Sequence, residues 1–235
     1  MQLFINIDSG ESEIPYDHSY QLYSGLLSLI DKQNPQLAKN LHAYSSNLMF
    51  SLSQLMPGGK KSFTKLGFRG ERFLFIISSI DDELIENIEQ CFLSADGIEL
   101  FNSNFKIHSV VHKVIQPSSE IENLKTRSPI IIKQEEKYLF NAPDDQVKIA
   151  IQSSIDRKYR KVLGSKPNIH FLKVTDIKWK IVAIKGIKLP AFMASFIIGA
   201  DLDVIRFVLS TGIGSKNKLG FGFVEEEKRG DSHGL

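Results

Sequence analysis

The stretch "TGIGSKNKLGFGF", residues 211–223, contains four glycines that flank a five-residue insert with two lysines. The glycines are Gly212, Gly214, Gly220 and Gly222. A dinucleotide fingerprint needs another glycine where Asn217 stands, and a phosphate-binding loop needs four residues between its glycines and then Lys, where Phe221 stands. Both motifs also join a strand to a following helix, whereas this segment lies between an expected helix and an expected strand. The spacing and the chain order therefore exclude both cofactor motifs.

The residues alone offer a structural interpretation of the same segment. Gly212 is placed to end a helix, and the later glycines are typical of strand positions where another backbone comes close. That interpretation does not require this particular spacing of glycines and lysines.

The first half of the chain predicts a β-α-β-β-α-β order, which is the ferredoxin-like unit. Its first helix places Tyr20, Tyr23, Leu26, Leu27 and Ile30 at helical spacing, which predicts one buried face. In its second helix, Asn34 is an expected N-cap and Pro35 the first helical residue. The expected elements are a strand at 2–8, helices at 18–32 and 34–44, strands at 47–55 and 72–79 separated by a polar loop at 56–70, a helix at 81–93 and a strand at 104–115.

The second half predicts a similar order after a polar segment, although the two halves share no sequence repeat. The expected elements are strands at 128–133 and 137–140, a helix at 144–163, two or three strands within 168–200, a helix at 201–212 and a strand at 220–226. The predicted fold is α+β, with two tandem ferredoxin-like (RRM-like) domains, each an antiparallel sheet with helices on one face. The predicted boundaries are an N-terminal domain at 1–116, a linker at 117–126, a C-terminal domain with the glycine-rich loop at 127–228, and a tail at 229–235.

Charge is distributed unevenly along the chain. Residues 1–125 contain ten Lys and Arg against fifteen Asp and Glu, and the remainder contains nineteen against twelve. A basic half indicates a polyanion partner, with solvated surface lysines as the alternative. The single Cys91 excludes a disulfide within the chain. The N-terminus lacks basic residues before its short apolar stretch and so does not resemble a signal peptide, and no apolar run is long enough to span a membrane. We therefore expect a cytoplasmic protein with no membrane partner.

The glycine pattern, G-x-G, five residues including lysine, then G-hydrophobic-G, resembles the signature of the repeat-associated RNA-binding superfamily of CRISPR proteins. It is most similar to the branch that cleaves CRISPR repeat RNA, the sixth Cas protein family. Three further stretches resemble the opening, the second helix with its strand, and the start of the second half in that family. They are "IPYDHSYQLYSGLLSLI" (14–30), "NPQLAKNLHAY" (34–44) followed by "LMFSLSQL" (48–55), and "RSPIIIK" (127–133).

The resemblance implies an endoribonuclease with two ferredoxin-like domains that cuts the repeat in CRISPR precursor transcripts. In the implied reaction the 2′-hydroxyl attacks the scissile phosphate and leaves a 2′,3′-cyclic phosphate and a 5′-hydroxyl, without a metal ion or a cofactor. Such chemistry needs a base, an acid and a cation or donor at the phosphate. The implied partners are repeat RNA and other CRISPR effector subunits, with the chain acting as a monomer or homodimer.

His42 lies where the resemblance places the catalytic histidine, and imidazole exchanges protons near neutral pH. The alternative is a histidine that merely ends its helix. The family pattern also places a tyrosine and a lysine at positions where this chain has Leu27 and Leu48. Tyr23, one helical turn before Leu27, and Lys39, one turn before His42, are the substitutes we expect, with Lys60 or Lys61 as further sources of charge.

For RNA binding, the expected phosphate contacts are basic residues from both halves. They are Lys60, Lys61, Arg69, Arg157, Lys185, Lys188, Lys216 and Lys218. Two alternatives stay open: the chain binds repeat RNA and cleaves it slowly or not at all, or it is a tandem ferredoxin-like module unrelated to RNA, in which the glycines are only turns.

Overall fold

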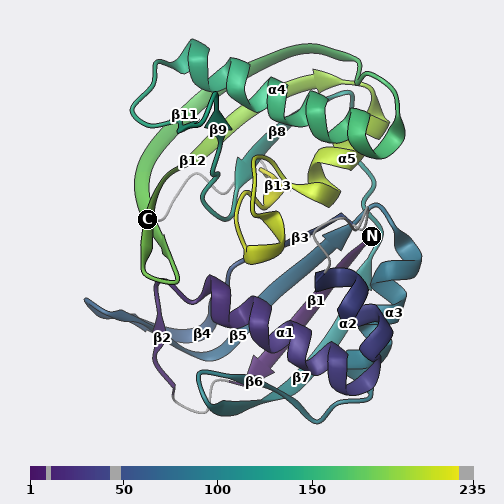
Figure 1. Ribbon diagram of the computed structural model, residues 1–235, viewed down its shortest axis with the longest axis vertical. Coiled ribbons are helices and arrows are strands. Elements are labelled where there is room, and N and C mark those ends of the chain that lie inside the picture. The colour runs from purple at the N-terminus through teal and green to yellow at the C-terminus, as the bar shows by residue number, and fades with distance from the viewer. Residues whose placement is uncertain (9–11, 43–48, 228–235) are drawn as a thin grey trace. The chain divides into compact units, whose positions relative to one another are not determined.

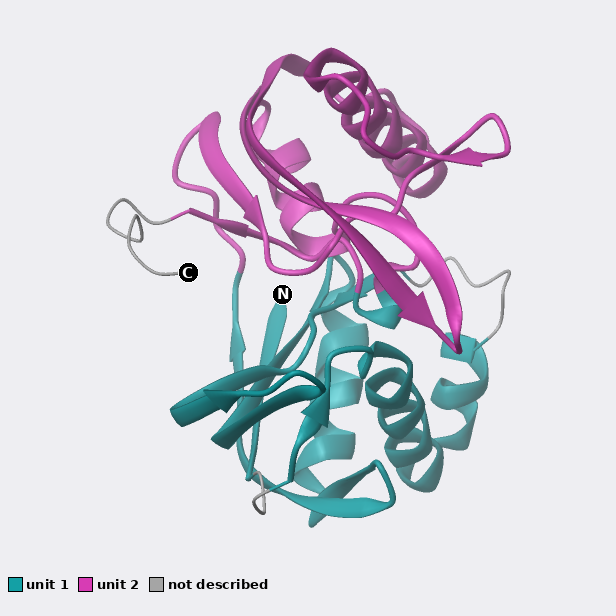
Figure 2. Ribbon diagram, turned by 90° about the vertical axis from the view of Figure 1, so that its left-hand side faces the viewer, with its two compact units in different colours: residues 1–114, 218–220 teal, residues 115–217, 221–235 magenta. Residues whose placement is uncertain are grey.

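The computed structural model describes residues 1–8, 12–42 and 49–227 (Figure 1). The chain forms two compact units (Figure 2). Unit 1 consists of Met1–Val114 together with Lys218–Gly220, and unit 2 consists of Ile115–Asn217 together with the described residues from Phe221 onward. Three residues of the glycine segment thus belong to unit 1, which corrects the expectation that the whole segment lies in the C-terminal domain. The expected tail at 229–235 lies outside the described residues.

Unit 1 is built on one antiparallel sheet with three helices in its described part. Its elements in chain order are β1 (Gln2–Asp8), β2 (Ile14–Pro15), α1 (Ser19–Gln33), α2 (Pro35–His42), β3 (Phe50–Leu52), β4 (Met56–Phe63), β5 (Gly67–Ser79), α3 (Asp82–Leu93), β6 (Gly97–Leu100) and β7 (Ser103–Lys113).

Strand β1 lies between β5 and β7, and β2, β3 and β4 all pair with β5. Ile5 is opposite Phe75 of β5 on one side and Val110 of β7 on the other. The order β1, α1 with α2, β3 with β4, β5, α3, β7 is β-α-β-β-α-β, and all the strand pairs are antiparallel. The ferredoxin-like prediction for this half is confirmed.

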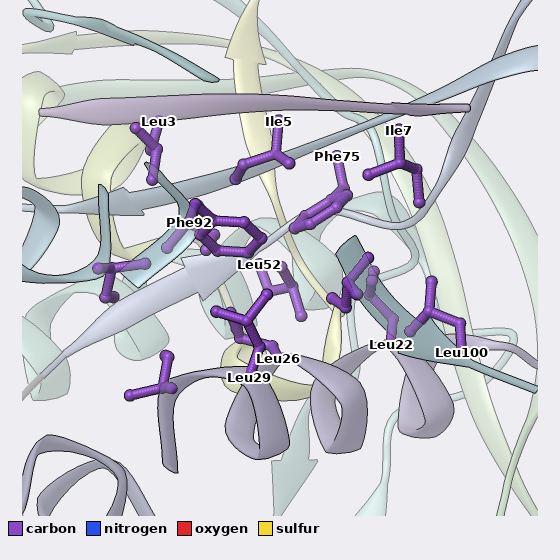
Figure 3. Close-up of a cluster of buried hydrophobic side chains, with 14 of the residues drawn as sticks. Leu3, Ile5, Ile7, Leu22, Leu26, Leu29, Leu52, Phe75, Phe92 and Leu100 are labelled. Carbon is purple, nitrogen blue, oxygen red and sulfur yellow. The ribbon is translucent and has the colours of Figure 1, made fainter. Parts of the chain in front are cut away.

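The core of unit 1 lies between the sheet and helices α1 and α3 (Figure 3). Strand β1 buries every second residue, and α1 faces it with leucines at helical spacing. These facing side chains are Leu3, Ile5, Ile7, Leu22, Leu26 and Leu29. Each such side chain stabilises the fold by about 2 kcal/mol through burial. The buried face of α1 differs from the predicted one. Tyr20 and Tyr23 are only half-buried, because the leucines of α1 lie nearest the sheet.

The segment 56–70 is a hairpin rather than the expected polar loop. Strand β4 pairs with β5, with Phe63 opposite Phe68 and a register shift between Gly58 and Lys61. The Thr64 side chain closes the turn, since its Oγ1 accepts hydrogen bonds from the N–H groups of Leu66 and Gly67. The polar composition misled the prediction because β4 is exposed over its second half and needs few apolar residues.

Unit 2 is a second antiparallel sheet with two α-helices in its described part. Its elements are β8 (Ile121–Thr126), β9 (Lys133–Gln134), β10 (Lys137–Tyr138), α4 (Asp144–Leu163), β11 (Ile169–Ile184), β12 (Ile187–Ala200), α5 (Leu202–Thr211), the 3-10 turn η1 (Asn217–Leu219, which crosses into unit 1) and β13 (Val224–Glu226).

The strand order is β11-β12-β8-β13, and the sequence order β8, α4, β11, β12, α5, β13 is again β-α-β-β-α-β. Helices α4 and α5 contact each other through the rings of Tyr159 and Phe207, whose centroids are 5.0 Å apart, and both contact the sheet. Strands β11 and β12 form one long hairpin, closed by Lys185 and Gly186 with positive φ. The second ferredoxin-like prediction is therefore confirmed.

Two expectations in this half are wrong. Residues 121–126 of the expected linker form β8, which pairs with both β12 and β13, because Leu124 and Thr126 face the core although the stretch is polar overall. The expected strand at 128–133 contains only two isolated bridges, from Ile130 and Ile131, before β9 begins at Lys133. Among the described residues, no helix combines the length and apolar character that crossing a membrane requires.

A buried histidine joins the start of α1 to the strands of unit 1. His18 is 2% exposed, and its Nδ1 donates to the Pro15 carbonyl at 2.8 Å. Its Nε2 accepts a hydrogen bond from the Leu55 N–H at 3.0 Å, so the ring is neutral with its proton on Nδ1. Burial lowers the pKa of His18 to about 4, against the partial opposition of the Pro15 hydrogen bond.

This arrangement predicts acid sensitivity of the fold. The unfolded chain takes up a proton at His18 below about pH 6.5, whereas the folded chain resists it until about pH 4. The His18 contribution to stability is therefore present above pH 6.5 and lost as pH falls toward 4. Urea titration should show that the free energy of unfolding falls between pH 7.5 and pH 4.5. We expect this fall to be about 2 to 3 kcal/mol smaller in His18→Gln than in the wild type.

His112 offers a control of opposite sign. It is exposed, and the hydrogen bond that its Nδ1 donates to the Glu89 carboxylate raises the pKa of His112. His112→Gln should not reduce the loss of stability on acidification. Equal pH dependence in His18→Gln and the wild type would contradict the role given to His18.

Candidate active site and RNA-binding surface

His42 is the last residue of α2 and is exposed. The helix begins as expected, with the Asn34 side chain accepting a hydrogen bond from the Leu37 N–H at 3.0 Å and Pro35 at the first helical position. Ala38 and Leu41 are buried in the core of unit 1 and fix which side of α2 faces inward. The imidazole is therefore held at the end of an anchored helix and is accessible to a ligand.

The two expected catalytic partners lie in different surroundings. Lys39 is exposed one turn before His42 on the same helix. Tyr23 is half-buried on α1 and packs against the core, and burial raises the pKa of its phenol, with a smaller effect from Tyr20. Among the described residues, no hydrogen bond joins Tyr23 to His42. Leu27 also packs against the core, and Leu48 lies outside the described residues.

The glycine segment follows α5 and precedes β13, as expected, and all four glycines have positive φ. Gly212 ends α5, with its N–H donating to the Val208 carbonyl at 2.9 Å. A Cβ on Gly214 would lie 2.5 Å from the Ile131 carbonyl oxygen, and one on Gly222 would collide with the Ile213 carbonyl oxygen. Sharp turns and close backbone contact both require glycine here, which confirms Gly212 as the end of the helix. Gly220 and Gly222 do not lie in the expected strand at 220–226, because β13 begins only at Val224.

Asn217 holds the base of the loop, a structural role that we did not predict from the sequence. It is buried, and its Nδ2 donates to the carbonyls of Ile213 and Phe221, each at 2.9 Å. An asparagine between glycines is a typical turn residue, which is the signal that could have identified it. These two hydrogen bonds join the chain segments that precede and follow residues 218–220.

Lys218 reaches the end of α2 within unit 1. Its Nζ donates to the Leu41 carbonyl at 3.2 Å and lies 5.6 Å from the centre of the Phe50 ring. The carbonyls in the last turn of a helix lack partners within the helix, and a cation at that end is favoured by the helix dipole. The structure thus brings Lys218 to the residue before His42. The sequence could not show this, since 177 positions separate Lys218 from Leu41.

Lys158 of α4 closes the end of α5 within unit 2. Its Nζ donates to the carbonyls of Thr211 and Gly212, at 2.9 and 2.7 Å. Burial lowers the pKa of this ammonium to about 7, and the neighbouring positive charge of Arg157 adds to the shift. Lys158 therefore anchors the start of the glycine segment rather than extending into solvent.

The remaining basic candidates are spread over both units. Lys60 and Lys61 are exposed on β4, and Arg157 is exposed on α4. Lys185 and Lys188 are exposed at the tip of the β11–β12 hairpin, and Lys216 is exposed beside η1. Arg69 instead donates to the Glu13 carboxylate at 3.0 and 3.2 Å, which ties it to a partner within unit 1.

A hollow of about 740 Å³ opens in unit 2 beside the β9–β10 hairpin. Lys133, Lys137 and Arg157 contribute positive charge to it and Glu135 negative charge, while Lys133 is also paired with Glu136 at 2.7 Å. Among the described residues, no group of three or more His, Cys, Asp or Glu side chains is placed to hold a metal ion.

Comparison with known proteins shows what family these features belong to. Residues 13–111 match the family model "CRISPR-associated protein Cas6, N-terminal", and residues 112–226 match "CRISPR associated protein Cas6, C-terminal". The chain belongs to the Cas6 family. This confirms the resemblance that the glycine signature carried.

Individual relatives agree with the family assignment. This Cas6 chain is 29% identical over 223 residues to "CRISPR-associated endoribonuclease Cas6 1" of Methanocaldococcus jannaschii, covering 90% of this chain and 86% of that protein. It is 28% identical to "CRISPR-associated endoribonuclease Cas6" of Pyrococcus furiosus, covering 92% and 84%. A solved "CRISPR associated protein Cas6" superposes with a TM-score of 0.83 at 26% identity, covering 97% of this chain and 99% of that one.

Replacing Lys158 should destabilise unit 2 of this Cas6 protein. Lys158→Met keeps most of the side-chain volume but leaves the carbonyls of Thr211 and Gly212 without their donor. We expect a loss of about 2 kcal/mol in unfolding free energy, measured by denaturant titration. Lys161→Met, at an exposed position one turn further along α4, is the control and should change stability little. Equal effects of the two substitutions would show that the two bonds contribute nothing.

Proposed function

We propose that this Cas6 endoribonuclease cleaves the repeat of CRISPR precursor transcripts with His42 as its acid–base residue. The observation that carries the proposal is the position of His42, exposed at the end of a helix whose inner side is anchored by Ala38 and Leu41. A histidine at this anchored helix end is open to solvent and accessible to RNA.

The proposed reaction uses the RNA's own 2′-hydroxyl as nucleophile. A base removes its proton while the oxygen attacks the adjacent phosphorus, and an acid protonates the departing 5′-oxygen, so that a 2′,3′-cyclic phosphate and a 5′-hydroxyl result. His42 serves one of these proton transfers, which are worth about 10²- to 10⁴-fold each in rate. Tyr23 and Lys39 remain proposed partners, of which only Lys39 shares the exposed end of α2.

Binding of the repeat is proposed to rest on the exposed basic residues of both units. Lys60, Lys61, Arg157, Lys188 and Lys216 present charge to phosphates, and the resulting affinity should fall steeply with salt. Solved relatives titled "An RAMP protein binding different RNA substrates" and "Cas6 (TTHB231) product complex" share the fold, with TM-scores of 0.82 and 0.64. We further propose that the protein acts in the cytoplasm, as a monomer or homodimer, with other CRISPR effector subunits as additional partners.

A second function is favoured by one observation, the leucine at position 27. This side chain packs against the core of unit 1 and offers no hydroxyl where the family pattern has tyrosine. A chain with this deficiency would bind repeat RNA and cleave it slowly or not at all. Cleavage assays separate the two functions.

The decisive test incubates the protein with repeat RNA in EDTA, beside the same RNA with a 2′-deoxy residue at the scissile position. We expect cleavage of the first RNA only. His42→Ala should slow single-turnover cleavage by about 10²-fold or more with affinity near normal, because it removes a proton-transfer group and no phosphate contact. His170→Ala, another exposed histidine, is the control.

Two other outcomes have distinct meanings. Tight binding of both RNAs without cleavage would support the non-catalytic function. Cleavage by His42→Ala at the wild-type rate would remove His42 from the mechanism while leaving the endoribonuclease itself intact.

A further inference from the structure

The reaction proposed above needs positive charge at the phosphate, and the candidate lysines differ in how well they could supply it. The resemblance would place a lysine where this chain has Leu48. Lys39 is exposed on α2, and Lys60 and Lys61 are exposed on the β4–β5 hairpin, so the position of each ammonium is loosely determined. The glycine segment provides another lysine at this end of α2.

Contacts of its ammonium hold Lys218 in place. Its Nζ donates to the carbonyl of Leu41, the residue before His42, and lies over the Phe50 ring. Gly220, two residues further along, is buried and has a φ of +83°, so the turn that carries Lys218 bends sharply. Lys218 is itself half-buried, so its charge acts in surroundings less polar than bulk water.

The loop that carries Lys218 is also preorganised. The two hydrogen bonds of Asn217 clamp its base, and the close approach at Gly222 fixes its exit. A charge that is fixed before the substrate arrives stabilises a transition state without the cost of reorganising the protein. Surface lysines that only bind RNA do not need a buried clamp of this kind.

We propose that Lys218 supplies the positive charge that stabilises the reacting phosphate beside His42. The glycine segment then contributes a residue to the catalytic site, in addition to any contacts by which it binds RNA. In the reaction, the ammonium counters the negative charge that builds on the non-bridging oxygens as the 2′-oxygen attacks and the 5′-oxygen leaves. It gains and loses no proton, so the acid–base steps remain with His42 and its partners. This inference rests on the proposed endoribonuclease function.

The test compares Lys218→Met, Lys218→Arg and Lys161→Met in single-turnover cleavage at saturating protein. Lys218→Met keeps an apolar stem on Phe50 and loses the charge, and we expect about a 10²-fold slower cleavage with RNA affinity within a few-fold of wild type. Lys218→Arg retains the charge and should recover most of the rate. Lys161→Met, at an exposed lysine with no assigned contact to RNA, is the matched control and should cleave at the wild-type rate.

A sulfur substitution separates a direct electrostatic role from a merely structural one. Repeat RNA with a phosphorothioate at the scissile position should be cut more slowly than normal RNA by the wild type. In Lys218→Met this difference should shrink, because the cation that distinguishes oxygen from sulfur is gone. A loss of rate with an unchanged sulfur effect would assign Lys218 to holding α2 only and would overturn the proposal.

The remaining outcomes are also decisive. Wild-type cleavage by Lys218→Met would overturn this inference and leave the role of His42 standing, whereas no cleavage by the wild-type protein would overturn the proposed function and this inference together. Thermal unfolding checks each variant. Should Lys218→Met not fold, Lys218→Gln replaces it: slow cleavage with a reduced sulfur effect supports the proposal, and the wild-type rate overturns it.

Discussion

The left-handed backbone of the glycine segment is the constraint on which the candidate site depends. The chain must leave α5, pass the carbonyl oxygen of Ile131, enter unit 1 for Lys218–Gly220 and return past the carbonyl oxygen of Ile213 to β13. Any side chain at Gly214 or Gly222 would collide with backbone, which cannot yield as a flexible side chain can. The spacing of the glycines therefore matches the positions where the backbone turns and where it comes close to other backbone segments.

Buried and half-buried polar side chains also hold the backbone in place, by forming hydrogen bonds with it. Lys158 satisfies the carbonyls at the end of α5, Asn217 satisfies those of Ile213 and Phe221, and Lys218 satisfies that of Leu41. His18 does the same at the start of α1 by bonding Pro15 and Leu55. Each of these side chains pairs a backbone group that would otherwise be buried without a partner, which costs about 1 to 3 kcal/mol per group. The bonds of His18 and Lys218 lie at the start of α1 and the end of α2, the two helices that carry the candidate catalytic residues.

Much of the fold was predictable because periodicity reflects burial. The strand at 2–8, the helix at 144–163 and the Asn34–Pro35 start of α2 were predicted from local sequence, and the structure confirms all three elements. Strands β4 and β8 were missed for a common reason, since both are polar and rely on neighbouring strands for their hydrogen bonds. The buried face of α1 was misjudged because Tyr20, Tyr23 and the leucines all fit helical spacing, and only the sheet selects among them.

The sequence by itself determined the two ferredoxin-like units, the family signature, and His42 as a histidine at the end of a helix, because each rests on residues close together in the chain. Tertiary structure alone decided that Lys158 anchors α5, that Arg69 is paired with Glu13, and that Lys218 reaches the residue before His42. Those contacts join residues 53, 56 and 177 positions apart. Local pattern cannot specify such contacts, because their formation depends on how strands and helices pack once the backbone has folded.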